Sequence, residues 1–159
     1  FLLPSRESIL SFAYKPYRRF LLMLCVSGVF GIWTGFAAIL MFRVFVISKF
    51  TMFFFASLAT VLVSGGFWKA YGVNFNNKNF YYWLMTIFFV IFEFAWVLYL
   101  TPIGFLVFGF LITWLWYILW LMGRFDLSPE GIIWKRQIYF FAVNIILYLF
   151  FIFFVIKWY

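Results

Sequence analysis

The 159-residue chain is 69% hydrophobic, 30% aromatic and only 10% charged, and its formal net charge is +8. A soluble domain is about 45–50% apolar and about 25% charged, so this composition excludes a water-soluble globule and a disordered chain. The basic residues are scattered between apolar segments, which makes lipid phosphates rather than nucleic acid the expected counter-charge. We therefore expect an all-α polytopic integral membrane protein with no nucleic-acid partner.

Five apolar stretches are each long enough to cross a bilayer as a helix, which takes about 20 residues. The predicted spans are residues 20–42, 50–68, 80–100, 103–122 and 138–156. The third and fourth are nearly continuous over 43 residues, but a single helix of that length would measure about 64 Å, roughly twice the membrane. We therefore expect a turn with Thr101 as a helix cap and Pro102 at the first position of the fourth helix. The predicted fold is a bundle of five transmembrane helices with short loops, preceded by an interfacial segment over residues 1–19.

The basic residues are divided unequally between the two ends of these spans. The end with the N-terminus holds Arg6, Lys15, Arg18, Arg19, Lys69, Lys78, Arg124, Lys135 and Arg136, and the other end holds Arg43, Lys49 and Lys157. Since loops rich in Lys and Arg stay on the cytoplasmic side, we expect the N-terminus on the positive, inside face. The expected location is either a bacterial inner membrane or an organelle membrane.

The residue inventory argues against catalysis and metal binding. His is absent, which removes the commonest general base and metal ligand, and the single Cys, Cys25, lies inside an apolar span. The sequence also has no phosphate-binding loop, serine-hydrolase elbow, zinc-protease or dinucleotide-binding motif. We predict that the protein is not an enzyme and has no catalytic residue, metal site or cofactor, although we expect bound lipids.

Glu93 is the one acidic residue inside a predicted span, about 10 Å from the outer end of that span by the helical rise. An ionised carboxylate at this depth costs several kcal/mol unless it is paired, protonated or wetted. Glu93 is therefore either an ion or proton site or a protonated or paired group that locks helices together. Arg43, which closes the first span on the same side, is the candidate partner, although such side chains usually extend to the headgroups.

Small side chains recur every four residues along the first span, at Ser27, Gly31 and Gly35. Such a stripe allows the backbones of two membrane helices to approach closely. A similar series lies in the second span at Ala56, Thr60 and Ser64. Either the two series pack together within the chain, or one of them receives a partner. Asn144 in the fifth span is a further candidate for helix packing, because its amide can bridge two helices.

Four aromatic residues crowd the inner half of the fourth span, namely Trp114, Trp116, Tyr117 and Trp120. A functional interpretation is a stacking platform for a pigment, a quinone or an isoprenoid lipid. The structural interpretation is a group of interfacial aromatics that also pack between helices.

The segment over residues 124–137 is rich in charge. We expect Ser128 to cap the fifth helix, with Pro129 at the first helical position and Glu130 near the positive helix end. As an alternative, Asp126 and Glu130 dock a partner or a polar head group.

We expect a non-enzymatic membrane subunit, or an accessory or scaffold protein, of a larger membrane complex. The loops are short, the apolar surface is extensive, and the sequence shows no motif of reactive side chains. The expected partners are membrane lipids and other integral membrane proteins; a hetero-complex is favoured, and a homo-oligomer is the alternative. One alternative is a small transporter or channel that uses Glu93 with Arg43. A weaker alternative is a lipid- or pigment-handling protein that uses the aromatic cluster of the fourth span.

Overall fold

The computed structural model describes residues 15–42, 48–70, 78–127 and 134–155 of the chain, and its regular elements are helices. They are α1 (Lys15–Met41), α2 (Lys49–Ala70), α3 (Lys78–Tyr99), α4 (Phe105–Asp126), α5 (Trp134–Phe150) and a continuing π-helical turn, η2 (Phe151–Val155). Within the described ranges, five helices are long and apolar enough to cross a membrane. The predicted all-α fold with five helices of this length is therefore confirmed.

The helices cover the predicted spans and differ from them mainly at the ends. α1 begins at Lys15 rather than Phe20, and α4 continues to Asp126 rather than ending at Met122. Both extensions run into residues of mixed polarity, where internal hydrogen bonding still satisfies the helical backbone. Residues 1–14 of the predicted interfacial segment and the predicted cap at Ser128 and Pro129 lie outside the described residues.

The chain reverses direction after α3, as predicted, but the turn is built differently. The Thr101 hydroxyl donates a hydrogen bond to the carbonyl of Leu98 (2.5 Å), which also accepts the backbone N–H of Thr101 (3.1 Å). Pro102, four residues after Leu98, has no N–H to donate to that carbonyl. α4 begins only at Phe105, and its N-cap is Gly104, which makes no side-chain capping bond. The prediction that Thr101 caps α4 and that Pro102 is its first residue is therefore wrong.

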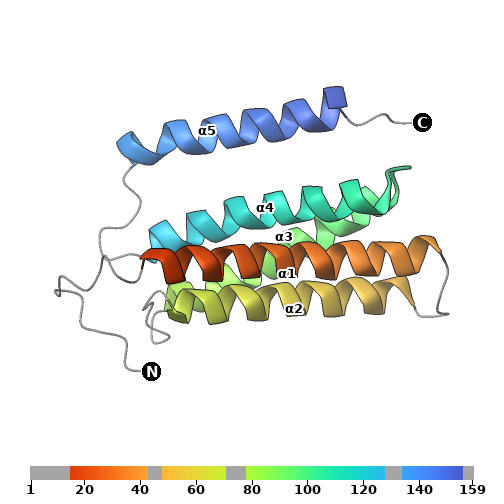
Figure 1. Ribbon diagram of the computed structural model, residues 1–159, viewed down its shortest axis with the longest axis horizontal. Helices are drawn as coiled ribbons and strands as arrows, with labels where there is room; N and C mark the ends of the chain where they lie inside the picture. Colours follow the sequence, from red (N-terminus) through yellow and green to blue (C-terminus); the bar gives the residue numbers. More distant parts are fainter. Residues whose placement is uncertain (1–14, 43–47, 71–77, 128–133, 156–159) are drawn as a thin grey trace.

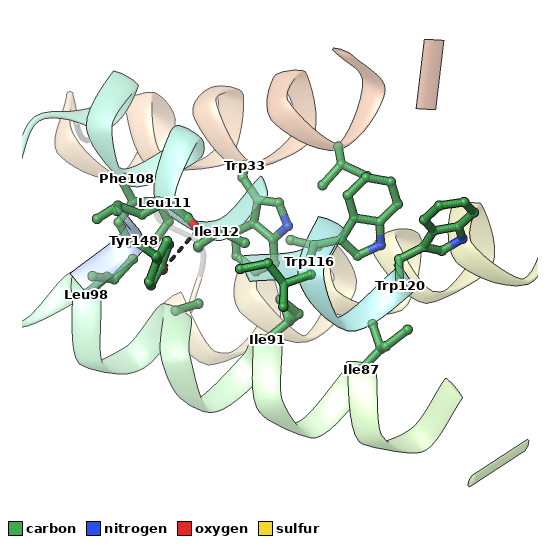
Figure 2. Packing of buried hydrophobic residues seen from close by; sticks show 14 of the residues in the cluster. Trp33, Ile87, Ile91, Leu98, Phe108, Leu111, Ile112, Trp116, Trp120 and Tyr148 are labelled. Carbon is green, nitrogen blue, oxygen red and sulfur yellow. Dashed lines mark hydrogen bonds between the residues drawn. The ribbon is translucent and has the colours of Figure 1, made fainter. Parts of the chain in front are cut away.

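The first four helices form a bundle, and α5 lies along one side of it (Figure 1). α1 packs most extensively on α4, and α2 packs on α3; further contacts join α1 to α2 and α3 to α4. These four interfaces close a ring in which α1 and α3 are diagonal. α5 packs chiefly on α4, where the Tyr148 hydroxyl donates to the carbonyl of Leu111 (3.1 Å; Figure 2). The Tyr148 ring also lies 5.3 Å from that of Trp114.

Two tryptophans inside the bundle donate hydrogen bonds to hydroxyls of α2. The indole nitrogen of Trp33 donates to Thr60 Oγ1 (3.0 Å), and that of Trp116 donates to Ser64 Oγ (2.7 Å). Each hydroxyl donates in turn to the carbonyl four residues earlier on α2, those of Ala56 and Thr60, both at 2.8 Å. All four side chains are fully buried, so these bonds satisfy polar groups that have no access to water.

α1 and α4 approach each other closely where Gly109 meets Thr34. A Cβ built on Gly109 would overlap Thr34 Oγ1 and would lie 3.0 Å from the Thr34 backbone nitrogen. Near the other end of α4, a Cβ on Gly123 would lie 2.5 Å from the ring of Trp68. The two glycines therefore set how closely α4 packs on its neighbours.

We expect Gly109→Ala to lower the free energy of unfolding by about 1–3 kcal/mol, because the added methyl group overpacks a contact that includes backbone atoms. Chemical unfolding of the purified chain in lipid–detergent micelles measures the change. Gly31→Ala is the matched control, since a Cβ there meets nothing within 4 Å, and it should change stability by less than about 0.5 kcal/mol. Equal losses in both variants would contradict the close approach at Gly109.

Candidate functional site

Glu93 lies within α3, and its side chain is exposed on the outer surface of the bundle. It precedes the end of α3 at Tyr99 by six residues, or about 9 Å along the helix axis. Ile87, Ile91 and Ala95 are fully buried on the opposite side of the helix. Glu93 therefore points away from the interior of the bundle. Within the part of the chain that the structure describes, it makes no hydrogen bond or ion pair.

The surface around Glu93 is otherwise almost entirely apolar. Phe89 and Val97, about one turn away on either side, are 56% and 57% exposed. We call the exposed residues of this side of the helix the α3 face: Tyr82, Met85, Thr86, Phe89, Glu93, Val97 and Leu100. The Thr86 hydroxyl donates to the carbonyl of Tyr82 (2.8 Å), so its proton is already engaged. The carboxylate of Glu93 is the charged group of the α3 face.

The predicted partner of Glu93, Arg43, lies outside the described residues. The helix that precedes it, α1, is diagonal to α3 across the bundle. At the end of α3 nearer to Glu93, Lys49 of α2 lies over the ring of Tyr99, with Nζ 4.6 Å from the ring centre. The ammonium group of Lys49 therefore contacts Tyr99, six residues after Glu93 in the chain, rather than the Glu93 carboxylate.

The small-residue series of α1 lies on the exposed side of that helix. Ser27, Gly31 and Gly35 are exposed, and a Cβ built on either glycine would meet nothing within 4 Å. The α2 series is fully buried and contacts indoles instead of α1 glycines. The structure therefore does not bring the two series together, and reception of a partner by the α1 stripe stays a prediction.

The predicted aromatic cluster of α4 is divided between the interior and the surface. Trp116 and Trp120 are buried in the bundle, where Figure 2 shows their rings following that of Trp33 along the interior. Trp114 and Tyr117 instead line an apolar groove of about 670 Å³ between α1 and α4. We call this the α1–α4 groove, and its lining residues are Leu22, Met23, Val26, Ser27, Phe30, Phe110, Thr113, Trp114 and Tyr117.

Sequence reasoning missed the α1 wall of this groove. Leu22, Val26 and Phe30 recur every four residues and so share one side of a helix. That spacing could have predicted that these apolar side chains form one lining of a groove next to the small-residue stripe. Pairing this wall with Trp114 and Tyr117 required knowledge of how α1 and α4 pack.

Two further predicted polar residues have local roles. The side-chain amide of Asn144 donates to the carbonyl of Phe140 in the same helix (2.9 Å), so this bond does not bridge two helices. Asp126 accepts a hydrogen bond from the indole nitrogen of Trp83 (2.8 Å), which joins the end of α4 to the beginning of α3. Glu130, its companion in the predicted docking site, lies outside the described residues.

Neither metal chemistry nor relatives of known function point to another site. Among the described residues, no group of three or more Cys, Asp or Glu side chains is placed to hold a metal ion. Comparisons with protein-family models, curated proteins and solved structures find no match for this chain. The α3 face and the α1–α4 groove are therefore the two candidate sites, and both are argued from their own residues.

We expect Glu93→Leu to change the free energy of unfolding of the isolated chain by less than about 0.5 kcal/mol, because the carboxylate has no partner in the described structure and faces the lipid–detergent micelle in both the folded and the unfolded state. Asp126→Ala is the comparison variant, since it removes the acceptor of the Trp83 indole, and we expect a loss of about 1–2 kcal/mol. Unfolding in lipid–detergent micelles measures both. A loss from Glu93→Leu as large as that from Asp126→Ala would mean that the carboxylate has a partner within the chain.

Proposed function

We propose that this chain is a non-enzymatic integral membrane subunit, or an accessory or scaffold protein, of a larger membrane protein complex. The observation that carries the proposal is the exposed Glu93 on the α3 face, with no hydrogen bond or ion pair to the described residues. A carboxylate left in hydrocarbon at this depth costs several kcal/mol. A second protein that covers the α3 face would remove that cost.

The proposal includes a membrane setting. Five apolar helices of sufficient length support a chain that crosses a bacterial inner membrane or an organelle membrane. The excess of Lys and Arg at the N-terminal end of the spans supports an N-terminus on the inside. The partners are then membrane lipids and other integral membrane proteins, with neither nucleic acid nor a cofactor.

A transporter that uses Glu93 would need the carboxylate to face a pathway through the bundle. The interior next to α3 is instead packed with rings, since Phe53 lies 6.4 Å from Trp33, 6.3 Å from Phe108 and 5.3 Å from Trp96 between ring centres. Because Glu93 is exposed on the opposite side of α3, these contacts favour the subunit proposal over transport through this chain alone.

Native mass spectrometry of the protein, extracted from its source membrane with lipids retained, tests the subunit proposal. We expect an assembly of fixed stoichiometry that contains at least one different membrane protein. Loss of this chain should also lower the abundance of that assembly. A chain that is only monomeric or homo-oligomeric in gentle extracts, with other assemblies unchanged by its loss, would refute the proposal.

A second candidate function is the binding of a membrane lipid or isoprenoid, and the α1–α4 groove supports it. Its volume of about 670 Å³ falls within the range of small-molecule sites, about 300–1,000 Å³. The hydroxyls of Ser27 and Thr113 are among the few polar groups in an otherwise apolar lining. Such a lining suits a hydrocarbon chain better than a polar metabolite.

We expect Ser27→Phe to fill the α1–α4 groove and to reduce any specifically retained lipid by about tenfold, which corresponds to 1.4 kcal/mol of binding. Organic extraction of the purified protein, followed by mass spectrometry, measures the retained species. Leu62→Phe, at a position of α2 that is 68% exposed, is the matched control and should retain the lipid. A wild-type extract that matches the bulk lipid of the membrane would contradict this second function.

A further inference from the structure

An ionised Glu93 on the α3 face needs a partner from outside the described structure. An ionised carboxylate accepts hydrogen bonds and donates none, so it needs a donor or a cation. Phe89 and Val97 offer neither, and the Thr86 hydroxyl already donates to a carbonyl of its own helix. Trp96, also one turn away, packs its ring 5.3 Å from that of Phe53 on α2 and makes no hydrogen bond with Glu93.

The helices that the structure describes do not supply the missing cation from a second copy of this chain. The basic residues within the five helices are Lys15, Arg18, Arg19, Lys49, Lys69, Lys78, Arg124, Lys135 and Arg136. Each lies within five residues of a helix end, whereas Glu93 is six residues from the nearer end of α3 on a helix of 22. A second copy in the same orientation therefore presents no helical cation at the depth of Glu93.

The spacing of the α3 face suits a neighbouring helix. Tyr82 and Phe89 are seven residues apart, as are Thr86, Glu93 and Leu100, and all of them are exposed. Residues seven apart form a continuous seam along a helix, against which a second helix can pack. Lipid phosphates would not neutralise Glu93, because they are negatively charged and lie at the membrane surface.

We infer that the α3 face docks a membrane helix of another protein, which carries a Lys or Arg at the depth of Glu93 and pairs with its carboxylate. The inference rests on the proposed subunit function and names the chemistry of the partner. The cation satisfies the acceptor-only carboxylate, while the apolar residues of the α3 face pack against the rest of the partner helix. Such a pair fixes both the depth and the rotation of the docked helix.

Site-specific photocrosslinking of the full chain in its source membrane tests this inference. The photoreactive residue p-benzoylphenylalanine replaces Phe89, and peptide mapping by mass spectrometry identifies what it captures. Phe55 of α2 is the control position, because it has the same exposed fraction as Phe89, 56%, and lies on another helix. We expect Phe89 to capture one membrane span that contains a Lys or Arg, and Phe55 not to capture that span.

Variants of Glu93 separate charge pairing from simple proximity. Glu93→Gln keeps the size of the side chain and one acceptor oxygen but removes its charge, so we expect the crosslink at Phe89 to fall at least about tenfold. Glu93→Asp keeps the charge and should retain most of the crosslink. Replacing the partner's cation by Glu in a Glu93→Arg chain should restore it.

Three results would overturn the inference: capture of lipid alone at Phe89, capture of a span without Lys or Arg, or an unchanged yield in Glu93→Gln. Native mass spectrometry of the same membranes distinguishes this failure from failure of the proposed function. A hetero-complex that persists under any of these results leaves the subunit function standing, with docking through another surface. A monomer or homo-oligomer refutes both proposals.

Discussion

The assembly of the bundle depends on two hydrogen bonds between indoles and hydroxyls, from Trp33 to Thr60 and from Trp116 to Ser64. Inside the bundle the indole N–H groups of Trp33 and Trp116 have no water to bind, so an acceptor within the protein avoids the cost of leaving them unpaired. α2 supplies one because each hydroxyl donates its own proton to a carbonyl of the helix and keeps its lone pairs for the indole. These bonds join α2 to its neighbour α1 and, across the interior of the bundle, to α4, so Trp33 and Trp116 mark the sides of α1 and α4 that face inward.

The surfaces of the bundle follow from that choice. With Trp33 facing inward, Gly31 and Gly35 of α1 are left on the outside. With Trp116 facing inward, Trp114 and Tyr117 turn to the α1–α4 groove. The interior of the described bundle is thus packed with rings and joined by buried hydrogen bonds, whereas its outer surface carries a lone carboxylate in an apolar face. Because the interior is filled, the proposed sites for a protein partner and for a lipid, the α3 face and the α1–α4 groove, both lie on the surface.

The number and extent of the helices were predictable because transfer into a bilayer depends on length and composition. The turn at Thr101 was found but misread, since the hydroxyl could serve the end of one helix or the beginning of the next. The close contact at Gly109 was missed because a single glycine forms no repeating pattern. Ser27, Gly31 and Gly35 form a clear one, yet a Cβ on either glycine would meet nothing within 4 Å. The exposure of Glu93 was also hidden, because a helix that is apolar on all sides carries little information about which side faces inward.

The sequence by itself determined that the chain is helical, that five stretches can cross a membrane, and that one acidic residue lies deep within a span. These properties are local, since each depends on the composition of about 20 consecutive residues. Only the tertiary structure decided that Glu93 faces outward, that the small residues of α2 rather than those of α1 are buried, and that α1 completes the groove. Those outcomes depend on hydrogen bonds and close contacts between residues far apart in the chain, such as Trp116 with Ser64 and Gly109 with Thr34.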